Sequence, residues 1–196
     1  MGSTPSAIAG LVLAGGRSSR FGADKATQLL SGRPLLAWSL AALDSVCAEV
    51  AVSATPGGDA AVLAGALGRT VMADDPRHEA GPLAGVAAGL AWAANAGFSY
   101  LATLPCDTPL VGPAIMQRLA TAAPAYAVTA DGPQALVAIW PTSACEGLAR
   151  TLAMGRHPSV RQALEACQAR AALFEDARPF RNANTPADLA ALARLV

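Results

Sequence analysis

The residues best suited to chemistry lie in a glycine-rich segment that follows the first apolar run of the chain. Residues 13–25 read LAGGRSSRFGADK, so Gly15 and Gly16 come directly after that run, with Arg20 and Lys25 behind them. Glycines let a backbone approach a ligand closely, and successive free N–H groups form a concavity that suits phosphate oxygens. We therefore expect an anion-binding loop here. The alternative is a glycine-rich turn with solvated arginines.

Lys25 is the single lysine among the 14 Lys and Arg residues of the chain. Arginine thus supplies the positive charge wherever only charge and solubility are needed. A compact ammonium on a flexible stem fits between phosphate oxygens in places where a planar guanidinium does not. We predict that Lys25 binds phosphate and that arginine cannot replace it.

Two aspartates follow apolar runs in positions that suit ligand binding. Asp107 comes just after residues 100–104, and Asp74 comes just after residues 70–73. Ligands of doubly wound folds gather at the carboxyl ends of the strands, and the lone carboxylate of Asp107 suits Mg²⁺, which fills its other positions with phosphate and water. In each case a simple turn before a proline is the alternative.

Two further segments carry small or uncharged polar residues. The segment from Gly81 through Pro82 and Leu83 opens a predicted helix, where free N–H groups let a base or ribose lie against backbone; an ordinary helix start is equally consistent with it. Asn182 and Asn184 flank one residue and so face the same side of an extended segment. Their uncharged amides can hold a phosphate group without adding negative charge near Asp107, and turn-forming asparagines are the alternative.

The elements that must position these residues alternate along the chain. Strands separated by helices indicate a three-layer α/β/α fold, with a Rossmann-like, mostly parallel sheet. The turn sequence Asp131-Gly132-Pro133 predicts a late antiparallel strand or hairpin, and Thr185 is the predicted N-cap of a C-terminal helix. We expect strands over 8–13, 50–54, 70–73, 100–104, 126–130 and 136–140, and helices over 34–42, 59–66, 83–94, 113–122, 142–153 and 158–169.

Length and composition limit the remaining classes. The 196 residues predict one domain over 1–196, with residues 1–6 as a disordered leader. A formal net charge of +0 excludes the basic field of a nucleic-acid-binding protein. Residues 80–106 are uncharged, but their glycines and Pro105 divide them, so we expect no membrane span. Four cysteines without metal-ligand spacing indicate reduced thiols in a cytoplasmic protein.

The chain resembles a family of nucleotidyltransferases in four segments. The glycine-rich segment 13–25 is followed by GPLAG at 81–85, LPCDTP at 104–109 and NANTP at 182–186. Their order and spacing are similar to those of the molybdenum cofactor guanylyltransferases, over roughly residues 8–192. Cytidylyltransferases that act on the same pterin usually have Gly-Asp-Met-Pro in the third segment, so the present sequence favours GTP over CTP.

The resemblance implies an enzyme that transfers GMP from GTP to the terminal phosphate of molybdopterin and releases pyrophosphate, with a nucleotide-diphospho-sugar transferase-like fold. It implies Mg²⁺ as cofactor, held by Asp107. It also implies transient contact with proteins that deliver the molybdenum cofactor or with the oxidoreductases that receive it. The implied catalytic residues are Arg20, Lys25 and Asp107; the nucleotide-binding residues are Leu13, Ala14, Gly15, Gly16, Lys25, Ser53, Asp74, Gly81, Pro82, Leu83 and Asp107; the acceptor-binding residues are Asn182, Asn184 and Arg156.

One departure from the family pattern lies on the acceptor side. Gln134-Ala135 stands where the guanylyltransferases have a His-Pro pair in a late strand. Two alternatives therefore stay open. The first is a related nucleotidyltransferase that uses CTP or another nucleoside triphosphate with a pterin, sugar phosphate or polyol phosphate. The second is a nucleotide-binding module without catalysis.

Overall fold

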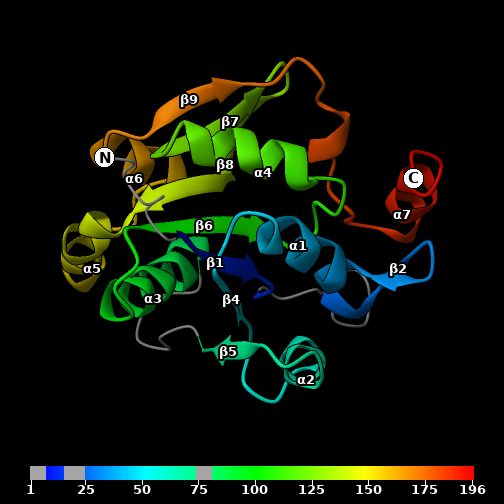
Figure 1. The fold of residues 1–196 in the computed structure, drawn as a ribbon, viewed down its shortest axis with the longest axis horizontal. Helices are drawn as coiled ribbons and strands as arrows, with labels where there is room; N and C mark the ends of the chain where they lie inside the picture. Colours follow the sequence, from blue (N-terminus) through cyan, green and yellow to red (C-terminus); the bar gives the residue numbers. More distant parts are fainter. Residues whose placement is uncertain (1–7, 16–24, 74–80) are drawn as a thin grey trace, which may run out of the picture.

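A seven-stranded sheet forms the centre of the computed structural model, which describes residues 8–15, 25–73 and 81–196 (Figure 1). The strand order is β5-β4-β1-β6-β8-β7-β9. β8 runs antiparallel to both of its neighbours, and all other pairs in the sheet are parallel. The predicted fold class, including the late antiparallel strand, is confirmed. The strands are β1 (Ile8–Leu13), β4 (Glu49–Ser53), β5 (Thr70–Met72), β6 (Tyr100–Pro105), β7 (Ala125–Thr129), β8 (Gly132–Pro141) and β9 (Arg170–Leu173).

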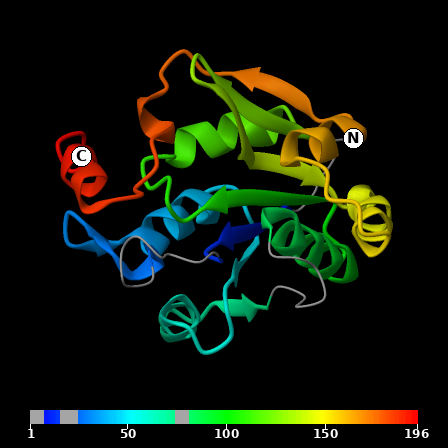
Figure 2. The ribbon, with the colours of Figure 1, turned by 180° about the vertical axis from the view of Figure 1, so that it is seen from behind.

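Helices cover both faces of the sheet, as the two opposite views in Figures 1 and 2 show. Buried residues of α1 (Leu35–Asp44), α2 (Asp59–Ala66) and α4 (Pro113–Thr121) join one hydrophobic cluster. Those of α3 (Pro82–Asn95), α5 (Cys145–Ala153) and α6 (Val160–Ala166) join a second cluster on the other face. The parallel strands are therefore buried on both sides, which explains why they read as continuous apolar runs.

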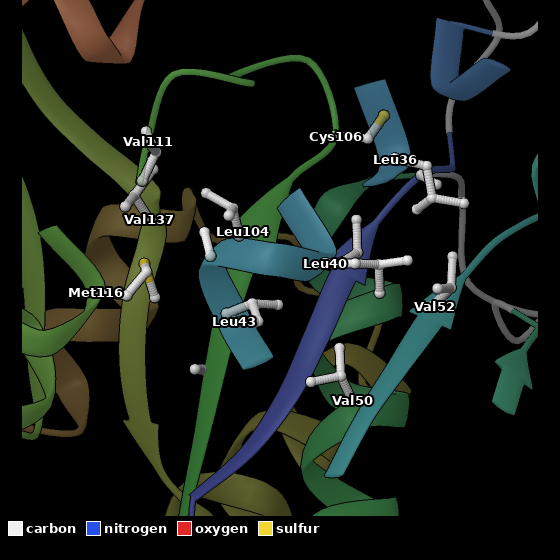
Figure 3. Packing of buried hydrophobic residues seen from close by; sticks show 14 of the residues in the cluster. Leu36, Leu40, Leu43, Val50, Val52, Leu104, Cys106, Val111, Met116 and Val137 are labelled. Atoms are coloured by element: carbon white, nitrogen blue, oxygen red, sulfur yellow. The ribbon is translucent and has the colours of Figure 1, made fainter. Parts of the chain in front are cut away.

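The stripe of leucines along α1 shows how sequence spacing builds the first of these clusters. Leu36, Leu40 and Leu43 recur at intervals of four and three residues, so they lie on one face of the helix. That face packs on the sheet beside Val50 and Val52 of β4, as Figure 3 shows. The helix is thereby fixed over the centre of the sheet.

Glycine allows a close approach on the opposite face. A Cβ atom at Gly89 of α3 would lie 2.6 Å from Cδ2 of Leu11 and 3.0 Å from Cδ2 of Leu101. The glycine thus lets the helix backbone pack directly onto β1 and β6. The uncharged segment 80–106 supplies this buried helix and strand, and no helix within the described ranges is long and apolar enough to cross a membrane.

A small hairpin and the C-terminal helix, neither part of the main sheet, pack on one another. β2 (Leu29–Leu30) and β3 (Arg33–Pro34) are joined by Ser31 and Gly32, whose φ angles of 50° and 79° are typical of a two-residue hairpin turn. A third buried cluster contains Leu30 of the hairpin, Leu35, Ala183 and Leu192. Leu192 is the last residue of α7 (Pro186–Leu192), and Ala183 lies just before that helix. This C-terminal cluster attaches the last segment of the chain to the segment that follows Lys25.

Several predicted elements have different bounds. The hairpin of β2 and β3 was not predicted. The first helix begins at Leu35 because Pro34 belongs to β3. The helix predicted over 158–169 ends at Ala166, and β9 occupies residues where we expected no strand. Gln168 between them has a φ angle of 59°, which ends the helix and reverses the chain. The C-terminal helix is confirmed, with the Thr185 side chain accepting a hydrogen bond from the backbone of Asp188.

The C-terminal cluster can be tested with two adjacent leucines of β2. Leu30 is fully buried, whereas Leu29 is 59% exposed. We expect Leu30→Ala to lower the free energy of unfolding by about 2–5 kcal/mol, because it removes buried apolar contacts and leaves a cavity. Leu29→Ala is the matched control and should change it by less than about 0.5 kcal/mol. Urea unfolding measures both, and equal losses would contradict the packing described.

Candidate functional site

A cleft lies where the central parallel strands end. The register aligns Leu13 of β1 with Ser53 of β4 and with Pro105 of β6, so these three strand ends lie at one level. Backbone hydrogen bonds continue one residue further, from Ala14 N to Ser53 O at 2.9 Å and from Cys106 N to Leu13 O at 3.1 Å. Residues at these strand ends, together with residues of α3, β8 and the segment before α7, line a cavity of about 640 Å³. This is the edge at which ligands of doubly wound folds bind.

Most of the predicted site residues that the structure describes line this cleft. They come from the ends of β1, β4 and β6, the start of α3, and the segment before α7. Their convergence follows from the parallel topology, which brings the carboxyl ends of neighbouring strands to one edge. The predicted residues in the lining are Leu13, Ala14, Gly15, Lys25, Ser53, Gly81, Pro82, Asp107 and Asn182.

Lys25 lies at the centre of the polar contacts in this cleft. It begins the short 3₁₀ helix η1 (Lys25–Thr27), and its Nζ donates a hydrogen bond to Asn184 Oδ1 at 2.6 Å. The same Nζ lies 3.4 Å from Asp107 Oδ2. The side chains of Lys25 and Asp107 are 24% and 23% exposed, so the pair is partly shielded but open to a ligand. One ammonium group therefore joins a carboxylate and a neutral amide.

The segment before α7 is held in place by its own backbone. Ala183 N donates to the carbonyl oxygen of Asp107 at 2.7 Å, and Ala183 itself is buried in the C-terminal cluster. Asn184 N donates to Asp188 Oδ2 at 2.9 Å. A hydrogen bond from the Thr185 side chain lowers the pKa of Asp188, and the backbone of Asn184 and Thr185 and the charge of Lys25 act in the same direction. Asp188 therefore stays ionised and fixes the backbone of Asn184 from one side while Asp107 fixes its neighbour from the other.

Three of the predicted site residues that the structure describes are not among the lining residues: Asn184, which contacts Lys25 instead, and Leu83 and Arg156. The side chain of Leu83 is 6% exposed and packs in the cluster under α3, so Gly81, Pro82 and Gly85 line the cleft around it. Arg156 is exposed in the turn between α5 and α6 and is not among the described lining residues, whereas Val160 from the start of α6 is. Neither side chain therefore contributes to the described lining.

Three predicted site residues lie outside the residues that the structure describes. They are Gly16, Arg20 and Asp74.

The far wall of the cleft was not predicted from the sequence. Pro133, Gln134, Ala135, Leu136 and Val137 of β8 all line the cavity. Because β8 follows β6 in the sheet order, this wall and the ends of β1 and β4 lie on opposite sides of Asp107. The only signal in the sequence was the departure at Gln134-Ala135, which did not indicate that the whole segment faces a ligand. The cleft therefore has two halves. The glycine-rich half is formed by the ends of β1 and β4 and the start of α3, and the β8 half is formed by residues 133–137.

Three of the four cysteines have thiol pKa values that are raised by burial. None of the four is part of a disulfide, and burial, reinforced by Asp44, raises the pKa of Cys47 to about 12. Burial also raises the pKa values of Cys145 and Cys167, so these thiols stay protonated at neutral pH. Within residues 8–15, 25–73 and 81–196, no group of three or more His, Cys, Asp or Glu side chains could hold a metal ion. A metal in this cleft would depend on few protein oxygens and on its ligand.

Comparison with known proteins gives a consistent picture. The model of the family described as "MobA-like NTP transferase domain" matches residues 10–174. The chain is 44% identical over 185 residues to a protein of Cereibacter sphaeroides named molybdenum cofactor guanylyltransferase, covering 92% of this chain and 93% of that one. A protein of Acidiphilium cryptum with the same name is 40% identical over 181 residues, covering 91% and 90%.

Solved structures share the fold. The molybdopterin-guanine dinucleotide biosynthesis protein A from Archaeoglobus fulgidus superimposes with a TM-score of 0.74 at 23% identity, covering 95% of this chain and 97% of that one. The 2-C-methyl-D-erythritol 4-phosphate cytidylyltransferase from Thermus thermophilus has a TM-score of 0.67 at 21% identity, covering 94% and 96%. Taken together with the sequence relatives, these matches show that the chain belongs to the molybdenum cofactor guanylyltransferases, nucleotidyltransferases with a MobA-like NTP transferase domain.

Proposed function

We propose that the protein transfers GMP from GTP to the terminal phosphate of molybdopterin, with release of pyrophosphate. The observation that carries the proposal is the contact of Lys25 with Asp107 and Asn184 in a cleft at the ends of parallel strands. The choice of GTP and molybdopterin as substrates is supported by the relatives, because proteins 40–44% identical to this chain are named molybdenum cofactor guanylyltransferase.

The reaction requires charge neutralisation and alignment more than proton transfer. An oxygen of the acceptor phosphate forms a bond to the α-phosphorus of GTP, the bond from that phosphorus to the bridging oxygen breaks, and pyrophosphate leaves with the electron pair. Because the attacking phosphate is already anionic at neutral pH, no strong general base is needed. In this proposal Lys25 stabilises the triphosphate charge, and Arg20 keeps the same role as a prediction from the sequence.

Asp107 is the residue that would hold Mg²⁺. Its Oδ2 faces Lys25, while no basic side chain in the described part of the chain forms an ion pair with its Oδ1. Magnesium is usually bound by one or two carboxylates together with substrate phosphates, so a single aspartate at this cleft fits it. The ion would supply further charge neutralisation at the phosphates.

The two halves of the cleft suggest where each substrate binds. Around Ser53, Gly81 and Pro82, the strand ends and the start of α3 offer small residues against which a guanine nucleotide can lie. Asn182 and the β8 half then receive the acceptor, on the other side of Asp107. This arrangement brings the acceptor phosphate and the α-phosphate together beside Lys25.

Nucleotide selectivity gives the most direct test of the proposal. Pyrophosphate release should be measured with ATP, CTP, GTP and UTP, each with and without molybdopterin. We expect release with GTP and only when molybdopterin is present. Equal or faster release with CTP would replace the proposal with a cytidylyltransferase, and binding of GTP without any release would indicate a module that binds nucleotides without catalysis.

Substitutions of Lys25 test the role of its ammonium group. Lys25→Ala should lower kcat by about 10² to 10³, because one charge that stabilises the transition state is lost. Lys25→Arg should also be impaired, since a planar guanidinium cannot reproduce a 2.6 Å contact with Asn184 and still reach the phosphates. Arg69→Lys is the matched control, because Arg69 pairs with Asp44 outside the described lining of the cleft. Normal turnover of GTP by Lys25→Arg would contradict the role assigned to Lys25.

The neutral amide of Asn184 leads to a separate prediction. Asn184→Asp is nearly isosteric but adds a carboxylate 2.6 Å from the lysine ammonium, where Asn184 Oδ1 now lies. The new charge would neutralise Lys25, so we expect the KM for GTP to rise about tenfold or more. Asn95→Asp at the end of α3 is the control. Steady-state kinetics measure the change, and an unaltered KM for GTP would show that the charge of Lys25 does not contact the nucleotide.

A further inference from the structure

β8 does not pair regularly with β7 along its length. Tyr126 is paired with Ala138, but the next residue, Ala127, is paired with Gln134. The residues between those two partners on β8, 135–137, therefore have no counterpart on β7. They form a large bulge in β8, which runs antiparallel to both of its neighbours.

The same part of β8 separates from β6. Pairing of these strands runs from Tyr100 with Pro141 to Thr103 with Ala138, whereas β6 continues to Pro105. Beyond Ala138 the two strands diverge, and residues 133–137 line the cleft that opens there. The bulge and the end of pairing thus coincide with the β8 half of the cleft.

A buried hydroxyl holds the middle of this bulge. Thr103 is fully buried on β6, and its Oγ1 donates a hydrogen bond to the carbonyl oxygen of Leu136 at 2.8 Å. The same Oγ1 accepts a hydrogen bond at 3.0 Å from Nε1 of Trp140, which is also fully buried. The hydroxyl therefore uses both its donor and its acceptor capacity, and one of its partners is the backbone of the cleft wall.

The apolar core does not account for a hydroxyl at this position. Thr103 shares its face of β6 with Leu101, which packs with Trp140 in the cluster under α3. A valine has nearly the same shape and would fill the space as well. Valine would leave the partly buried Leu136 carbonyl and the buried Trp140 indole N–H without this hydroxyl as partner, and unpaired buried polar groups cost free energy unless the backbone moves to satisfy them.

We propose that Thr103 is a positioning residue for the acceptor: its hydroxyl fixes residues 133–137 as the wall against which the acceptor lies. The proposal rests on the proposed function, because it takes the β8 half of the cleft as the acceptor half. Thr103 itself is buried behind that wall and acts through the Leu136 carbonyl. Thr103 is not among the described residues that line the cleft.

The test separates the KM values for the two substrates. Thr103→Val should raise the KM for molybdopterin about tenfold and leave the KM for GTP within about twofold, because only the β8 half shifts. Thr103→Ser keeps the hydroxyl and should restore the KM for molybdopterin. Ile139→Val, on β8 next to the bulge but in the opposite cluster, controls for a general loss of core packing. A parallel rise of both KM values, or no rise in either, would overturn the proposal.

Two further measurements keep the result independent of the stability of Thr103→Val and of the proposed function. Hydrogen–deuterium exchange should show faster exchange of residues 133–137 in Thr103→Val than in Thr103→Ser, and equal exchange would overturn the proposal whatever the substrates are. Leu136→Ala leaves Thr103 in place and should also raise the KM for molybdopterin alone; an unchanged value would overturn it. Failure of the proposed function is distinct, because the wild-type protein would then release no pyrophosphate from GTP with molybdopterin.

Discussion

A single ammonium group connects three distant parts of the chain, and the architecture of the cleft depends on that connection. Lys25 lies 82 residues from Asp107 and 159 residues from Asn184, yet its Nζ contacts both. The contact is possible because β1 and β6 are neighbours and end at one level, and because the C-terminal cluster holds the segment before α7 against the hairpin that follows Lys25. A lysine shared by one carboxylate and one amide keeps part of its positive charge available for an anionic ligand.

The two faces of the sheet contribute to this arrangement in different ways. Under α1, a leucine stripe packs on the parallel strands and fixes the level at which they end. Under α3, Gly89 permits a close approach that places the N-terminus of the helix, with Gly81 and Pro82, at the cleft. Both are packing constraints, and both act on the glycine-rich half. The β8 half depends instead on a polar contact, the hydrogen bond from Thr103 to Leu136.

The sequence predicted what local patterns encode. Apolar runs and alanine-rich periods indicated most strands and helices, and Thr185 was recognisable as an N-cap. β9 was missed because an alanine-rich sequence continues across Gln168, whose positive φ angle is a tertiary outcome. Glycines, an acidic residue after an apolar run and paired asparagines indicated one half of the cleft. The β8 wall could not be predicted, because it results from a shift in strand register between β7 and β8. No residue type in the segment indicates such a shift.

The bulge in β8 also bears on how such a cleft can diversify. A change of length within a regular strand shifts every later side chain to the opposite face of the sheet and so disrupts the core. Residues 135–137 lie outside the register with β7, so the pairs on either side of them can persist when that segment changes in length or composition. The strand ends around Lys25 have no such freedom, since their register sets the position of the phosphate site. One half of the cleft can therefore acquire new ligand preferences while the other retains the chemistry.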